Sequence, residues 1–355
     1  MKLTPGEIYF IGERDHLTGV TSPYYKIGIV RADDTRGTVN RLNEHQTGNP
    51  RPLFIHTVIP CELVERVETL MHGLQARYRL GGSEWFEFDE LVLEETIRTT
   101  QAYAEQTTAA AEFFKAAEEL KSERANDVVL PATDELRDLH LNLLVAEATV
   151  KQFDLVLTDI RKAMREAIER GEKVGGAAQI ANISFKEVFD KDALKAAHQE
   201  LYERYIKVTV SESRSWSISR AGSKEEIERR LTDKIEPIIH EINLAIAAAQ
   251  AGEIPKSQLN EQVIIIREHQ AAAKWESELY LAQLKVAVGT NAGIEGLCKW
   301  GMSSKTTKTF QEAPFMAENF ELYKQFLILR QVGGGMLLNP GQNAASEAFN
   351  DTSHP

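Results

Sequence analysis

The first ninety residues alternate short strand-like runs with turn signals, whereas the chain beyond them reads as long helices. The strand-like runs lie at residues 6–12, 25–30 and 53–59, with Gly- and Pro-containing turns between them. After residue 91 the composition shifts to Ala, Glu, Lys and Leu at helical spacing. The sequence therefore predicts an α+β fold, in which a small three-stranded antiparallel sheet with flanking helices is followed by a mainly α-helical region.

The same change in pattern divides the chain into four expected parts. They are an α+β unit over residues 1–92, a helical linker over 93–133, a mainly helical domain over 134–332, and a flexible tail over 333–355 that is rich in Gly, Asn and Ser.

The predicted helical domain contains an internal sequence repeat. Without a gap, and at an offset of 121 positions, residues 189–194 and 200–205 align with residues 310–315 and 321–326. We expect a duplicated packing unit over about 147–207 and about 276–328, and chance similarity is the alternative.

Charge and composition limit the classes of function. The net charge of −12 argues against a general nucleic-acid coat, although five basic and three acidic residues lie between Lys26 and Arg51 and leave room for a local phosphate contact. No apolar run is long enough to span a membrane and no signal peptide is recognisable, so we expect a cytoplasmic protein. The two cysteines, Cys61 and Cys298, have no CxxC partner and are expected to be buried thiols.

Polar residues with catalytic potential lie within the predicted strands and helices of the α+β unit. In chain order they are Tyr9, Lys26, Arg41, His45, Glu68 and His72. Arg41 and His45 lie four residues apart, so on a helix they share a face, and the last pair repeats that spacing. Singly, each has an ordinary interpretation as packing or as a solvated helix face. In that order, these residue types could assemble a one-metal phosphodiesterase site.

Several short motifs carry a resemblance to a known family. They are IY at 8–9, KIG at 26–28, RL at 41–42, TGNP at 47–50, ETLMH at 68–72 and EWF at 84–86. Over about residues 5–90 the chain resembles the GIY-YIG nuclease superfamily, in the phage-related branch whose second motif reads KIG. The helical half is more weakly similar to C-terminal segments of phage recombination exonucleases.

The resemblance implies a role for each matched residue. Tyr9 would activate the attacking water together with Lys26, whose charge is expected to favour the phenolate. Arg41 would grip the scissile phosphate, and His45 would lie near the attacking or leaving oxygen. Glu68 would hold a single Mg²⁺ or Mn²⁺ ion.

Other basic residues and His72 have less defined expected roles. Arg36 and Arg51 are expected to add phosphate or DNA contacts. His72 is expected either to take part in the chemistry or to pack the helix and orient Glu68.

The sequence thus predicts a metal-dependent endonuclease that acts on nucleic acid, with DNA as the expected substrate. The alternative is a non-catalytic module that binds or recruits DNA, which the acidic charge favours, as does the lack of a family asparagine in segment 81–84. The helical region is expected to contact DNA, a protein partner or a second copy of the chain.

Overall fold

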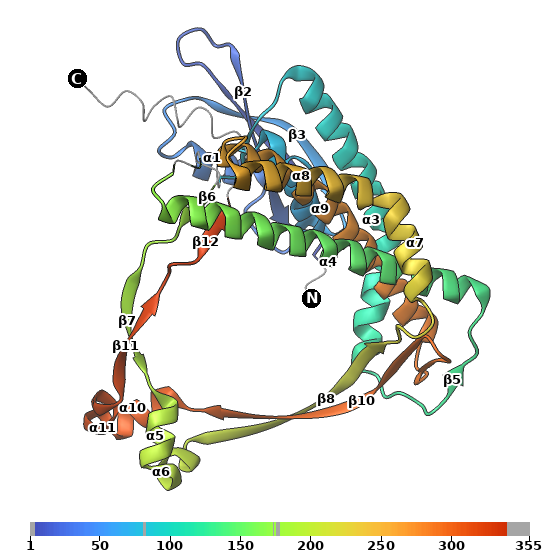
Figure 1. Ribbon diagram of the computed structural model, residues 1–355, viewed down its shortest axis with the longest axis vertical. Coiled ribbons are helices and arrows are strands. Elements are labelled where there is room, and N and C mark those ends of the chain that lie inside the picture. Colours follow the sequence, from blue (N-terminus) through green and yellow to red (C-terminus); the bar gives the residue numbers. More distant parts are fainter. Residues whose placement is uncertain (1–3, 81–82, 173, 175–177, 339–355) are drawn as a thin grey trace.

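The structure is a computed structural model that describes residues 4–80, 83–172, 174 and 178–338 of the chain. A small α+β unit lies at the N-terminal end, and long helices form a body beside it (Figure 1). Two β-ribbons lead from this body to a helical tip.

The sheet of the α+β unit is antiparallel throughout, in the order β3-β1-β2-β4. Its strands are β1 (Gly6–Arg14), β2 (Thr21–Arg31), β3 (Leu53–Cys61) and β4 (Trp85–Glu87). The predicted fold class, an antiparallel sheet with flanking helices followed by a helical region, is confirmed. The sheet has one strand more than predicted because β4 is only three residues long, too short to show an alternating pattern.

Different helices cover the two faces of this sheet. They are α1 (Thr38–Gln46), α2 (Val64–Leu74) and α3 (Glu90–Ser122). Successive residues of β1 point to opposite faces, so Ile8 and Phe10 share a core with α2 and α3. Tyr9 lies on the other face, where it packs with Leu42 of α1. The alternation thus places the Tyr9 side chain beneath the helix that carries the predicted phosphate-binding residues.

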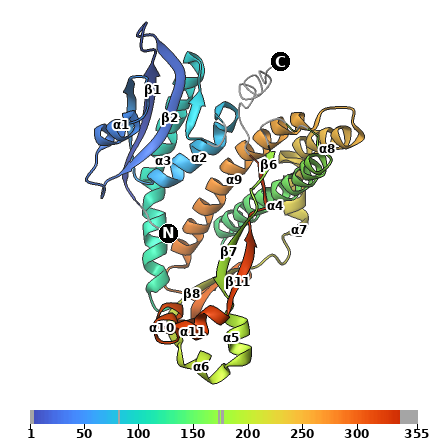
Figure 2. The ribbon, with the colours of Figure 1, turned by 90° about the vertical axis from the view of Figure 1, so that its left-hand side faces the viewer.

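The body is built around one central helix. Its members besides α3 are α4 (Asp134–Glu169), α7 (Lys224–Lys234), α8 (Glu236–Ala251) and α9 (Leu259–Val288). Helix α9 packs against α2 and α3 on one side and α4 on the other, so it joins the α+β unit to the rest (Figure 2). Because α3 begins at Glu90, it crosses the predicted boundary at residue 92, and the division into domains stays a prediction.

Two antiparallel ribbons interrupt the region that was predicted to be mainly helical. One pairs β8 (Ile206–Ile218) with β10 (Cys298–Phe310), and the other pairs β7 (Ser184–Phe189) with β11 (Leu327–Val332). Most of their residues are exposed on both faces. The ribbons therefore extend from the body instead of covering it.

The ribbons meet at a small helical tip. It contains α5 (Lys191–Ala197), α6 (Gln199–Arg204), α10 (Glu312–Glu318) and α11 (Phe320–Gln325). The two segments of the internal repeat have the same order of elements, which is a strand, two short helices and a strand. The first strand of each copy pairs with the last strand of the other, as in an isologous dimer.

Contacts in the core of the tip repeat at the same offset. Phe189 stacks on Tyr323 with ring centroids 4.5 Å apart, and Phe310 stacks on Tyr202 at 4.7 Å. Each aromatic pair joins one copy to the other, so an approximate two-fold axis passes through the tip.

Three small strand pairs complete the description. Strand β5 (Val129–Leu130) pairs with β9 (Gly293–Ile294), which also pairs with β10, and β6 (Ala178–Ile180) pairs with β12 (Met336–Leu338). Strand β12 belongs to the predicted tail, whose residues 339–355 lie outside the described part. Cys61 and Cys298 are buried and free. Among the described helices, none combines the length and apolarity that a membrane span requires.

Candidate functional site

Tyr9 and His45 meet between the sheet and α1. The Tyr9 hydroxyl and Nε2 of His45 are hydrogen-bonded at 3.2 Å. The Tyr9 ring lies against Gly28 on the neighbouring strand, where an added Cβ would be 2.4 Å from the hydroxyl oxygen. Glycine at this position therefore leaves the space that the phenol occupies.

Burial keeps both members of this pair uncharged at neutral pH. It raises the pKa of Tyr9 to about 12, and the nearby charge of Arg41 opposes that rise. Burial also lowers the pKa of His45, as do the charges of Lys26 and Arg41. The pKa of Tyr9 thus moves away from the phenolate that the sequence analysis expected beside Lys26, because burial outweighs the positive charge of Arg41 and the charges of Glu84, Glu68 and Glu44 add to the rise.

Lys26 is paired with a carboxylate that the sequence analysis did not assign. Its buried ammonium forms an ion pair with Glu84, whose side chain is half-exposed. This ion pair lowers the pKa of Glu84. Glu84 opens the EWF motif at 84–86 and precedes β4, and only the folded sheet brings it to Lys26, so the motif alone gave it no role.

Glu68 is a largely buried carboxyl group on α2. Burial raises its pKa from 4.5 to about 7, the charge of Glu84 adds to the rise, and Lys26 opposes it. Glu68 also raises the pKa of Tyr9, so the two side chains lie within electrostatic reach of each other. Glu68 thus belongs to the same neighbourhood as the Tyr9–His45 pair and the Lys26–Glu84 ion pair.

Arg41 lies beside this neighbourhood on α1. One of its terminal nitrogens is 2.8 Å from Glu44, whereas its Nε is buried and has no hydrogen-bond partner among the described residues. A buried donor without a partner is costly, and an anion can satisfy it. Arg41 thus retains hydrogen-bonding capacity for a phosphate.

The other two predicted basic residues form ion pairs with acidic side chains. Arg36 is exposed and pairs with Asp34 and Glu44, so it is linked to Arg41 through a shared carboxylate. Arg51 pairs with Glu13 near the start of β3. Arg36 is thus joined to Arg41, whereas the backbone carbonyl of Arg51 accepts a hydrogen bond from Gln46, the neighbour of His45.

His72 is occupied in holding α2 to the sheet. Its Nε2 lies 3.2 Å from the backbone carbonyl of Ile27, and its ring packs on Phe86 at 5.2 Å. Burial lowers its pKa. Of the two expected roles, packing agrees with these contacts, and one turn of α2 separates His72 from Glu68.

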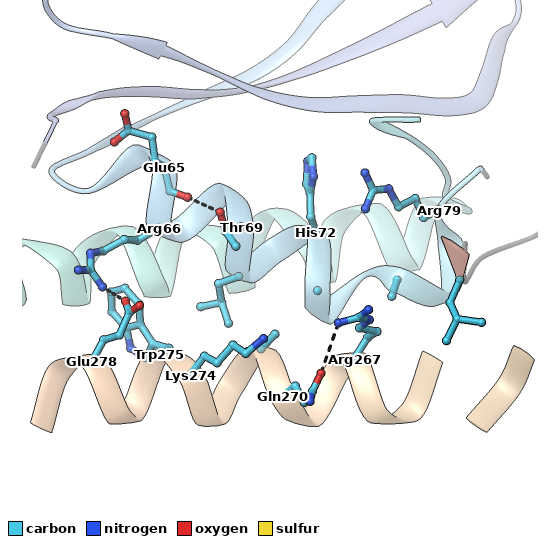
Figure 3. Close-up of a pocket in the computed structure, with 15 residues that line it drawn as sticks. Glu65, Arg66, Thr69, His72, Arg79, Arg267, Gln270, Lys274, Trp275 and Glu278 are labelled. Atoms are coloured by element: carbon cyan, nitrogen blue, oxygen red, sulfur yellow. Dashed lines mark hydrogen bonds and ion pairs between the residues drawn. The ribbon is translucent and has the colours of Figure 1, made fainter. Parts of the chain in front are cut away.

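A second concave feature lies between α2 and α9 (Figure 3). This groove has a volume of about 750 Å³, and its sides carry Arg66, Arg267, Lys274 and Glu278. Arg66 forms an ion pair with Glu278 across the groove. Glu68 does not line it, so the groove is separate from the Tyr9–His45 neighbourhood.

Metal-ligating groups are few around Glu68. No cluster of three or more His, Cys, Asp or Glu side chains suited to a metal ion occurs among the described residues. Glu68 and the nearby Glu84 offer carboxylate oxygens, the donors that Mg²⁺ prefers, and Mg²⁺ commonly retains several waters. A cation would also relieve the burial and repulsion that raise the pKa of Glu68.

Comparison with known proteins gives a match to a family model over the N-terminal unit. A family model, the T5orf172 domain, matches residues 6–101, which contain β1 to β4 and the start of α3. No curated protein and no solved structure matches the chain. The T5orf172 domain is phage-related and is associated with endonuclease-like folds. The N-terminal α+β unit is therefore similar to a phage-related, nuclease-like or DNA-interacting domain.

Proposed function

We propose that the α+β unit is a GIY-YIG-type endonuclease that hydrolyses phosphodiester bonds of DNA with Mg²⁺ or Mn²⁺. The observation that carries the proposal is that the Tyr9 hydroxyl is hydrogen-bonded to His45 and that the charges of Arg41 and Glu68, from two further helical positions, both act on its pKa. These residue types supply a proton acceptor, an anion-binding group and a metal ligand. The T5orf172 match supports a nuclease-like unit at this end of the chain.

The Tyr9–His45 pair would take the proton of the attacking water. Because the pKa of Tyr9 is about 12, its hydroxyl keeps its proton at neutral pH and is a poor base alone. The neutral imidazole of His45 is hydrogen-bonded to that hydroxyl and can accept a proton. Water would therefore pass its proton to Tyr9 as Tyr9 passes its own to His45.

Arg41 and Glu68 would hold the scissile phosphate and the cation. The buried Nε of Arg41 and its terminal nitrogens form a planar fork that suits phosphate oxygens. Glu68, assisted by Glu84, would hold the divalent cation, which when bound neutralises charge on the phosphate. Lys26, which forms an ion pair with Glu84, would also donate a hydrogen bond to a phosphate oxygen.

The test is DNA cleavage by the full chain with Mg²⁺. We expect Glu68→Ala to abolish cleavage of supercoiled and linear DNA while the circular dichroism spectrum stays unchanged. Glu62→Ala removes an exposed carboxylate just before the same helix and is the matched control, with parental activity. Parental cleavage by Glu68→Ala would refute the assignment.

A second candidate function is DNA binding without cleavage. It is favoured by the ion pairs that already engage Lys26 and Arg41 and by the high pKa of Tyr9. This function predicts that the parent protein binds duplex DNA and leaves it intact with Mg²⁺ or Mn²⁺. Cleavage that depends on Glu68 excludes it.

A further inference from the structure

The register of the β8–β10 ribbon separates two chemically different faces. Residues directly opposite each other in an antiparallel pair point to the same side. Trp216 pairs with Trp300, and the next pair along points to the other side. Alternate pairs therefore define an anchored face, which includes the tryptophans, and a second face that we name the lysine–hydroxyl face.

The lysine–hydroxyl face contains only lysine, serine, threonine and one glycine. Its members are Lys207, Thr209, Ser211, Ser213, Ser215 and Ser217 of β8, with Lys299, Gly301, Ser303, Lys305, Thr307 and Thr309 of β10. All of them are exposed except Gly301, which is partly buried. The face therefore carries three positive charges, no carboxylate and no apolar side chain.

This composition is unusual for the chain as a whole. The protein has 53 acidic and 41 basic residues, and its helices carry mixed charges joined by many ion pairs. None of the three lysines on this face forms an ion pair with a described carboxylate. A strand face that only has to be polar for contact with water would carry carboxylates as readily as lysines. The absence of negative charge instead fits an anionic ligand.

The opposite, anchored face is different. It carries Val208, Val210 and Met302 as exposed apolar residues, and Glu212 is its carboxylate. Lys308 lies on this face, three residues from Lys305 on the same strand and equally exposed. Lys305 and Lys308 therefore lie on opposite faces of the ribbon, only three residues apart along β10.

The ribbon is held firmly at its base. Arg214, a residue of β8 on the anchored face, is buried and donates hydrogen bonds to the backbone carbonyls of Trp300, Gly289 and Asn291. Its guanidinium also lies 3.9 Å from the centre of the Trp300 ring. At the far end Phe310 is buried in the tip. Anchorage at both ends fixes the ribbon, so little conformational freedom remains to be lost on binding.

We propose that the lysine–hydroxyl face binds the sugar-phosphate backbone of double-stranded DNA. This proposal deepens the proposed function, on which it rests for the choice of ligand, because it locates a DNA contact outside the α+β unit. Lysine and hydroxyl side chains are common partners of phosphate oxygens, and small Ser and Thr side chains let the strands approach closely. The major groove of DNA accommodates a two-stranded β-ribbon.

The dimensions of the ribbon agree with this ligand. Each strand has thirteen residues. At about 3.3 Å per residue the strands extend about 43 Å, slightly more than one helical turn of B-DNA. Along β10, the positions of Lys299, Lys305 and Thr309, which pairs with Lys207, span about 33 Å. The three charges are thus spread over one turn instead of being gathered at a single phosphate.

The proposal is tested by DNA binding in the presence of EDTA, so that no cleavage occurs. Fluorescence anisotropy of a labelled duplex three helical turns long is measured over a series of KCl concentrations with the full chain. The triple variant Lys207→Ala/Lys299→Ala/Lys305→Ala should lower the magnitude of the negative slope of log K against log salt concentration by about 2.7, since each lost phosphate contact removes about 0.9. Lys305→Ala alone should lower it by about 0.9.

Lys308→Ala is the matched control and should keep the parental slope. A triple variant with parental slope and affinity overturns the proposal, and so does an equal effect of Lys305→Ala and Lys308→Ala. A triple variant that instead changes the oligomeric state in size-exclusion chromatography assigns the face to contacts between copies. A parent that binds DNA in this manner but never cuts it refutes the endonuclease and leaves the ribbon proposal standing.

Discussion

Replacing Glu68 with Gln should stabilise the metal-free protein at alkaline pH. Burial, with the charge of Glu84, raises the pKa of this carboxyl group from 4.5 to about 7. At about 1.4 kcal/mol per pKa unit, ionising Glu68 costs the folded state up to about 3–4 kcal/mol. Gln keeps the shape of the side chain and carries no charge, so the variant avoids this cost.

The sign follows from proton binding. Between about pH 4.5 and about pH 7 the folded state holds a proton on Glu68 that the unfolded chain has released. Stability contributed by this group is therefore fully present below about pH 4.5 and is lost as the pH rises through about 7. The advantage of Glu68→Gln over the parent should be absent at the acidic end of this window and largest above it.

The measurement is thermal unfolding followed by circular dichroism in EDTA across this pH window. Glu62→Gln, which changes an exposed carboxylate, should follow the parent at every pH. Added Mg²⁺ should raise the melting temperature of the parent above about pH 7 and leave that of Glu68→Gln unchanged, because a ligand stabilises the state that binds it. A difference between variant and parent that does not change with pH would refute the reasoning.

Two further substitutions test the packing. Gly28→Ala places a methyl group against the Tyr9 hydroxyl, so we expect a loss of about 1–3 kcal/mol in stability and a marked loss of cleavage; parental cleavage would show that the position of Tyr9 is unimportant. Tyr202→Leu and Tyr323→Leu each remove one of the two related ring stacks in the tip and should lower stability by about 1 kcal/mol each, as measured by urea unfolding. Unchanged stability of both variants would contradict a contribution of these ring stacks.

The sequence was sufficient where one face of an element is buried. The strands that contain Tyr9 and Lys26 lie where their apolar runs predict them. The placement of Arg41 and His45 on one face of α1 also follows from their spacing of four residues. These features depend on local periodicity, which a single sequence displays.

The ribbons and Glu84 were missed for a different physical reason. Strand β8 has exposed residues on both faces, so no alternation of apolar and polar residues marks it. Its partner β10 lies beyond three helices in the chain. Glu84 gains its role through an ion pair with Lys26, more than fifty residues away. The direction of the Tyr9 pKa shift was missed because it depends on burial by neighbouring elements.

The topology of the tip has a consequence for the order of folding. All of α7, α8 and α9 lies between β8 and β10, and the tip cannot close until these strands have paired. Pairing strands so distant in the chain is slow unless intervening structure has already brought them together. We therefore expect the helices of the body to form first. Strands β8 and β10 would then pair progressively from their anchored base at Arg214 toward the tip. Strands β7 and β11 would pair last.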